Sequence, residues 1–324
     1  MIRGALLGFI MTPEQIQLFI TAAGSPAAIA LGSSPAIIKV FGCIHEYIGL
    51  WWQPHQILRE AKAQAQADAT SQLIRQSLDP NATENERFLA RGLMANEKTT
   101  IREQRNKESI VLKALPEVKE DAKPEEVEDD WYANFFDKSR LVSSEEMQML
   151  WAKVLAGEVN RPGFFSKRTL ALLSTLENEE GKNFQSLCRL SPTSSGDSVH
   201  PDFPLLYNHK DPICEKLGLT FHELMELSNI GLIHFDGESE FVESELSANG
   251  IIRLSYHGRR FDIFGVEAGE DFYCGRVLLT TLGGQIATLL SVDPVDGFEN
   301  YVLREWKKRG YKVSAYHPEP PQET

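Results

Sequence analysis

Apolar residues recur at helical spacing in the segment that opens at Pro35, and the stripe ends in two adjacent tryptophans. Intervals of three and four residues place these side chains on one face of a helix. The stripe consists of Ile37, Val40, Phe41, Ile44, Ile48, Trp51 and Trp52. Tryptophans in this position are typical of a helix at a membrane–water boundary, and the same face would suit another subunit or the protein's own core. We therefore predict a contact face for a membrane or a protein partner.

The whole segment 1–52 has few charged residues, namely Arg3, Glu14, Lys39 and Glu46. A short helix is expected over residues 12–23, because threonine is a suitable N-cap and proline suits the first helical position. Glycines and prolines between residues 24 and 35 interrupt the apolar run, whereas a membrane-spanning helix needs about 20 apolar residues. The short run after Arg3 is a weak match to a signal peptide. We interpret residues 1–52 as an apolar N-terminal segment without a single clean span.

Two long helices are predicted for residues 53–115, which form a stalk in our interpretation. Residues 56–78 are rich in alanine and glutamine, and alanine has the highest helix propensity. The second helix, residues 83–115, is polar with sparse apolar positions. Such helices usually bridge domains or pair with another copy, so we expect a homo-oligomer. Residues 116–130 form an acidic linker, and acidic runs are usually solvated connectors.

Residues 131–191 predict a compact helical domain. Trp131, Phe135 and Phe136 form one apolar face. Ser143 and Glu146 have the spacing of a capping box, and the helix that follows would bury Met147, Leu150, Trp151, Val154 and Leu155. A structural motif ends this region: close packing at Gly157, a turn at Pro162 and Gly163, an N-cap at Ser166, and an ion pair between Glu158 and Arg168 that joins two helices.

Residues 205–317 change in character and predict an α+β domain. Strands are expected at 232–235, 251–256, 260–266 and 311–315, with helices from Phe221, from Thr281 and over 301–309. A helix followed by short strands suggests a winged-helix-like module. Residues 318–324 are expected to be a disordered tail. The predicted fold class is therefore mainly α, with a long helical stalk, a compact helical central domain and a C-terminal α+β (winged-helix-like) domain.

One stretch carries a resemblance to a known family. Its features are Asp130-Trp131, Phe135-Phe136, Glu145-Glu146-Met147-Gln148, Trp151-Ala152, Leu155-Ala156-Gly157-Glu158, Pro162-Gly163, Phe165-Ser166 and Arg168-Thr169-Leu170. This pattern resembles the uncharacterised bacterial family DUF2806, most strongly over residues 50–191. The resemblance implies a bacterial protein with no agreed activity, so no catalytic residue is implied. The family's layout is similar to that of abortive-infection proteins, which act in defence against phage.

Charge and chemistry narrow the function further. The net charge of −13 disfavours a general nucleic-acid binder. The alternative is a strip of phosphate contacts formed by Arg253, Arg259 and Arg260 on the C-terminal module. The four cysteines lack C-x-x-C spacing and favour a reducing, cytoplasmic compartment. His209, Cys214 and His222 lack zinc-ligand spacing, and neither a phosphate loop nor a hydrolase motif occurs, so we assign no catalytic residue, metal or cofactor.

Together these patterns predict a non-enzymatic bacterial interaction or effector protein. It would self-associate through its stalk and contact the inner membrane or a partner through its N-terminal apolar segment, in the cytoplasm or at the membrane periphery. The alternative function is a nucleic-acid-linked regulator that uses the winged-helix-like module. An enzyme with a dispersed active site is a third hypothesis.

Overall fold

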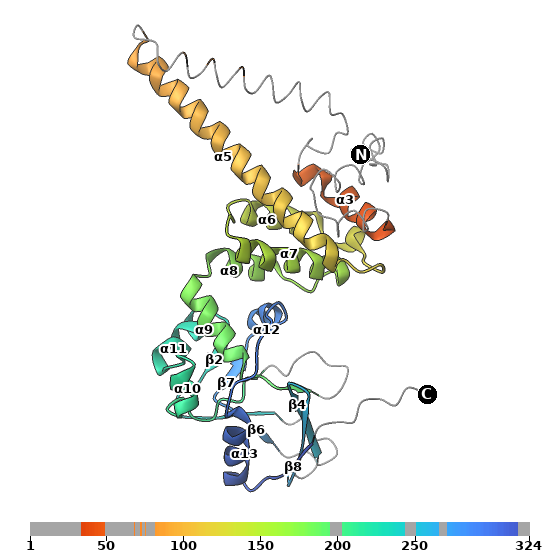
Figure 1. The fold of residues 1–324 in the computed structure, drawn as a ribbon, viewed down its shortest axis with the longest axis vertical. Helices are drawn as coiled ribbons and strands as arrows, with labels where there is room; N and C mark the ends of the chain where they lie inside the picture. The colour runs from red at the N-terminus through yellow and green to blue at the C-terminus, as the bar shows by residue number, and fades with distance from the viewer. Residues whose placement is uncertain are drawn as a thin grey trace. The chain divides into compact units, whose positions relative to one another are not determined.

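The computed structural model describes residues 34–48, 82–194, 203–243, 251–265 and 271–316, with three isolated helical residues at 68, 72 and 75. The chain divides into two compact units between Ser174 and Thr175, whereas the sequence predicted a central domain that continues to residue 191. The first unit is helical and the second combines helices with small antiparallel sheets, as Figure 1 shows. The class of mainly α with a C-terminal α+β region is thus confirmed. The helix predicted at 12–23 and the tail at 318–324 lie outside the described residues.

The first unit contains five described α-helices and two 3₁₀ turns. They are α3 (Pro35–Ile48), α5 (Glu84–Ala114), η2 (Leu115–Glu117), η3 (Pro124–Glu126), α6 (Asp129–Ser139), α7 (Glu145–Asn160) and α8 (Lys167–Thr175). The C-terminal part of α5 packs along α7, and α3 packs against η3, α6 and α5. The core between them is aromatic, with Trp131 stacked on Phe135 and Phe135 edge-on to Trp151. None of the helices described here combines the length and apolar character needed to cross a bilayer.

Helix α5 begins directly after its N-cap residue, Thr83. The Thr83 hydroxyl accepts the Glu86 N–H at 3.3 Å, and the Glu86 carboxylate accepts the Thr83 N–H at 2.7 Å, which is a capping box. From Asn106 onward the helix buries one face against its neighbours, whereas Ala90 is the single buried residue between Glu84 and Arg105. The N-terminal part of α5 accordingly extends past α6 and α7 (Figure 1).

Two local predictions in this unit are corrected. Helix α7 is capped by Ser144, whose hydroxyl accepts the Met147 N–H, because Ser143 instead accepts a hydrogen bond from the Asn106 side chain at 3.3 Å. The acidic linker keeps its carboxylates exposed as predicted, but it is not a free connector. Its apolar members Ala122, Pro124 and Val127 are buried on the first unit.

The second unit contains five helices and eight strands among its described residues. The helices are α9 (Asn178–Cys188), α10 (Pro212–Lys216), α11 (Phe221–Asn229), α12 (Thr281–Ala287) and α13 (Phe298–Lys308). The strands are β1 (Thr193–Ser194), β2 (Ile233–Phe235), β3 (Phe241–Glu243), β4 (Ile251–Tyr256), β5 (Arg259–Phe264), β6 (Phe272–Gly275), β7 (Val277–Leu279) and β8 (Lys312–Tyr316).

All strand pairs among the described residues of this unit are antiparallel. One sheet has the order β1-β4-β5-β8, and two further sheets pair β2 with β7 and β3 with β6. Helix α13 packs beside β8, and its Trp306 ring lies 5.6 Å from the Phe261 ring of β5. The face of the four-stranded sheet that carries Phe261 is therefore the buried one. The winged-helix detail of the predicted class stays a prediction.

Candidate functional site

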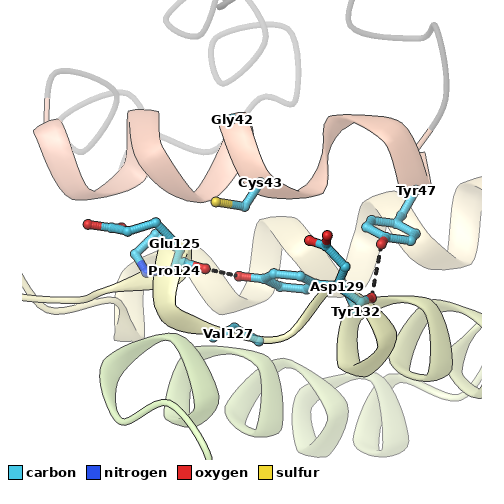
Figure 2. A pocket seen from close by; sticks show the side chains of 8 residues that line it. All are labelled: Gly42, Cys43, Tyr47, Pro124, Glu125, Val127, Asp129 and Tyr132. Carbon is cyan, nitrogen blue, oxygen red and sulfur yellow. Dashed lines mark hydrogen bonds between the residues drawn. The ribbon is translucent and has the colours of Figure 1, made fainter. Parts of the chain in front are cut away.

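A pocket of about 250 Å³ opens in the first unit between α3 and the η3–α6 segment (Figure 2). Its lining comes from two stretches of chain that are far apart in the sequence: Gly42, Cys43, Tyr47, Pro124, Glu125, Val127, Asp129 and Tyr132. The side chain of Asp129 is directed toward α3, and the Cys43 thiol points toward the end of the pocket that Glu125 and Pro124 line. The pocket therefore lies along the line on which α3 meets the rest of its unit.

Several polar contacts fasten α3 to the rest of its unit, among them a hydrogen bond from the Gln104 side chain to the Ile48 carbonyl. The Tyr47 hydroxyl donates to the Asp129 carbonyl at 2.9 Å, and the Lys39 ammonium pairs with the Glu125 carboxylate at 2.9 Å. The Lys107 ammonium donates to the Tyr47 carbonyl at 3.4 Å. On the opposite wall the Tyr132 hydroxyl donates to the Pro124 carbonyl, also at 2.9 Å, which fixes the η3 turn over the Tyr132 ring.

The ionisable groups of the pocket suit binding better than nucleophilic chemistry. Burial, followed by the charges of Glu125 and Asp129, raises the pKa of the Cys43 thiol, so the thiolate is scarce at neutral pH. Burial is also the main cause that raises the pKa of the Tyr132 hydroxyl. Neither group is an activated nucleophile. Within the described ranges, no group of three His, Cys, Asp or Glu side chains could hold a metal ion.

The sequence did not predict this pocket, although one weak signal was present. Lys39, Cys43 and Tyr47 recur at intervals of four residues and form a row beside the apolar stripe of α3. The opposing residues lie in the segment that was interpreted as an acidic linker. No pattern within either stretch indicates that the two meet.

The predicted contact face of α3 is turned inward. Ile37, Val40, Phe41, Ile44 and Ile48 are each at most 1% exposed. Packing on the protein's own core, one of the alternatives left open by the sequence, is the arrangement of this helix, and Tyr47 next to the stripe stacks on Phe136 with ring centroids 5.6 Å apart. Trp51 and Trp52 lie outside the described residues. Contact of this face with a membrane or a separate partner stays a prediction that requires α3 to move.

The structural motif at the C-terminal end of α7 is built around a buried carboxylate. Glu158 is 2% exposed, and its two oxygens accept the backbone N–H groups of Gly163 at 2.7 Å and Phe165 at 2.8 Å. The predicted ion pair between Glu158 and Arg168 is wrong, because these amides occupy the carboxylate and Arg168 is exposed. The Trp131 indole donates to the Phe165 carbonyl at 2.7 Å, so the same turn is held from both sides.

The remaining motif residues explain why this turn has its sequence. A Cβ at Gly157 would lie 2.7 Å from the Phe165 ring, so the predicted close packing is present. Gly163 has a φ of +82°, in the region that favours glycine, directly after Pro162. Trp151 is fully buried, and the Ser166 hydroxyl accepts the Thr169 N–H at 3.1 Å as an N-cap. The described contacts of the motif therefore hold the turn between α7 and α8, which is a structural role.

The predicted phosphate strip does not form one surface. Arg253 and Arg260 are exposed on the outer face of the four-stranded sheet, where Arg253 lies 3.8 Å from Asp262. Arg259 points to the other face, because side chains alternate along a strand, and it pairs with Glu299 of α13. The strip is thus reduced to two arginines, one of them beside a carboxylate.

A comparison with known families identifies the chain. The family described as "Protein of unknown function (DUF2806)" matches residues 90–303. This match covers most of the chain, from near the start of α5 to the middle of α13, and the chain therefore belongs to that family. No curated protein matches the chain. No solved structure matches it either.

Proposed function

We propose that this DUF2806 protein is a non-enzymatic bacterial effector that works by releasing α3. The observation that carries the proposal is the way in which this helix packs on the rest of its unit. A complete apolar face is buried within the protein's own unit, while an open pocket and solvent-accessible polar contacts lie along its edge. An apolar helix held in this way is protected from water until a trigger frees it for the inner membrane or for a protein partner.

The free energies of the contacts that hold α3 in place indicate what a trigger must do. Burying five large apolar side chains stabilises the docked helix by about 7–15 kcal/mol at roughly 1.5–3 kcal/mol each, as an upper estimate. The Tyr47 hydrogen bond adds about 0.5–1.5 kcal/mol. The exposed Lys39–Glu125 pair adds about 0–1 kcal/mol. Breaking the polar contacts alone therefore leaves α3 docked, and full release needs a second apolar surface that accepts the same face.

Self-association and a defence setting complete the proposal. Phe88, Leu89, Leu93 and Ile101 of α5 are 43–68% exposed, and such apolar side chains would be shielded by pairing with a second copy. The resemblance to abortive-infection proteins supports a role in which phage infection is the trigger. That setting predicts a lower plating efficiency of phage on cells that produce the protein.

The test removes two polar contacts that hold α3 in place and leaves its apolar face unchanged. A Tyr47→Phe, Lys39→Ala variant should raise the open population of α3 roughly 5–30-fold, which corresponds to a loss of about 1–2 kcal/mol. Hydrogen exchange over residues 35–48 should accelerate by a similar factor, and more protein should sediment with anionic vesicles. Lys182→Ala, which removes an exposed ion pair in the other unit, is the matched control.

Faster exchange without any gain in vesicle or partner binding would show that α3 is only a structural element. Deletion of residues 1–52 is a poorer test, because it would also expose the Tyr132 and Phe136 rings on which α3 rests.

A further inference from the structure

The N-terminal part of α5 carries a row of basic side chains on one face. Arg91, Lys98, Arg102 and Arg105 follow each other at intervals of seven, four and three residues. At 1.5 Å per residue the row is about 21 Å long. Met94 and Ala95 occupy this face between the first two bases, so no carboxylate interrupts the row.

The four bases are exposed and unpaired. Each has an exposed side chain, and no ion pair in the part of the chain that the structure describes involves any of them. By contrast, Glu103 on another side of the same helix pairs with Arg140, the residue that follows α6. Lys98 and Arg102 are like charges at i, i+4, and Arg102 and Arg105 at i, i+3. Each such pair opposes the helix, and an anion along the row would remove this repulsion.

The chain's acidic balance does not extend to this helix. Residues 1–174 have 20 Lys and Arg against 22 Asp and Glu, whereas residues 175–324 have 13 against 24. The first unit is therefore close to neutral, and eight of its acids belong to the segment 116–130. Interactions between exposed charges are largely screened beyond about 8–10 Å at ordinary ionic strength. A polyanion at the row would interact mainly with the row itself.

We propose that this row binds the phosphate backbone of duplex DNA. A helix with side chains is about 10–12 Å thick, and the major groove is about 12 Å wide. An uninterrupted row matches a polymer that is charged along its whole length, and three of its four bases are arginines, which bind phosphate in bidentate geometry. The proposal concerns the backbone alone, because a row of positive charges matches phosphates that every sequence carries.

The opposite face argues against a membrane as the partner of this row. Leu89 and Leu93 lie across the helix from the bases, but the same face continues with Asn96, Thr100 and Glu103. An apolar face of less than two turns is too short for a helix that lies in a bilayer interface.

The experiment compares two full-length variants that lose the same charge. The first changes Arg91, Lys98, Arg102 and Arg105 to Gln. The control changes four exposed bases of the second unit that belong to no predicted binding surface, Lys210, Lys216, Lys307 and Lys312, to Gln. Binding to a labelled duplex of arbitrary sequence is measured by fluorescence polarisation across a salt series. The circular dichroism of each variant checks that α5 remains helical.

The unmodified protein should bind the duplex at low salt, with log K falling against log salt at a slope of about −3 to −4 for four phosphate contacts. The row variant should lose at least tenfold in affinity and most of this slope, while the control should retain both. Equal loss in both variants, or no binding by the unmodified protein at low salt, would overturn the proposal. So would a row variant that binds DNA normally but loses binding to anionic vesicles or loses oligomeric mass in light scattering.

Discussion

Replacing Glu158 by alanine tests whether the buried carboxylate organises the turn between α7 and α8. The substitution leaves the N–H groups of Gly163 and Phe165 without their partner at 2.7 and 2.8 Å. A buried donor left unsatisfied costs about 1–3 kcal/mol, so two cost about 2–6 kcal/mol. Removing a buried charge recovers part of this. We therefore expect a net loss of about 2–4 kcal/mol in the free energy of unfolding of the first unit.

The assay must separate the two units, because a single unfolding midpoint is poorly defined for such a chain. Hydrogen exchange resolved by peptide does so: exchange over residues 145–175 should accelerate, and exchange over 203–243 should not change. Glu146→Ala is the control, since this exposed acid in the first turn of the same helix contributes less than about 1 kcal/mol. A Glu158→Ala effect no larger than that of the control would refute the reasoning.

The acid–base behaviour of Glu158 predicts the direction in which the stability of this turn changes with pH. Burial, the largest cause, raises the pKa of this carboxyl above its ordinary value of 4.5, while the hydrogen bonds from Phe165 and Gly163 lower it in part. The folded state therefore favours the protonated form. This contribution to stability is fully present below pH 4.5 and is lost as the pH rises through the folded pKa. Glu158→Gln should abolish this component of the pH dependence of exchange over residues 145–175.

Three further predictions concern the second unit and its thiols. Gly283→Ala would place a methyl group 2.0 Å from a backbone carbonyl oxygen, so we expect a loss of at least about 3 kcal/mol, measured by exchange in the peptides around α12. Tyr301→Phe removes the hydroxyl that accepts two backbone N–H groups at 2.7 and 3.2 Å, which should cost about 1–3 kcal/mol in chemical denaturation. Burial raises the pKa of Cys188 and Cys214 to about 12, so both thiols should react with a disulfide reagent at neutral pH only after unfolding. The stability linked to these thiols is fully present below their ordinary pKa of 9.0 and is lost as the pH rises toward 12, which denaturation at rising pH would detect.

Elements with local signals were predictable from the sequence. Pro35 opens α3, Thr83 caps α5, and the strand expected at 251–256 is β4 (Ile251–Tyr256). Caps and periodic apolar positions act within a few residues, so one stretch of sequence contains the whole signal. Strands β1, β3, β6 and β7 were missed, because four residues or fewer are too few to show a period and each pairs with a partner far along the chain.

The errors at the candidate sites have a common physical origin. Glu158 and Arg168 have opposite charges at a suitable distance along the chain, but backbone amides of the intervening turn take the carboxylate. Arg259 and Arg260 are neighbours in sequence and lie on opposite faces of β5. Backbone donors and strand register are properties of the folded chain. A pattern of side-chain types does not reveal them.

The two proposals place all contacts with other molecules on the first unit and assign them to separate surfaces. The five apolar side chains of α3 are each at most 1% exposed, whereas the four basic side chains of the α5 row are exposed. A surface that is always open suits reversible, salt-dependent binding, and a buried one suits a step that happens after a trigger. DNA binding by the row should therefore be unchanged in the Tyr47→Phe, Lys39→Ala variant, while vesicle binding rises. A joint change in both activities would indicate that α3 and α5 move as one element, and the two surfaces would then have to be described as a single site.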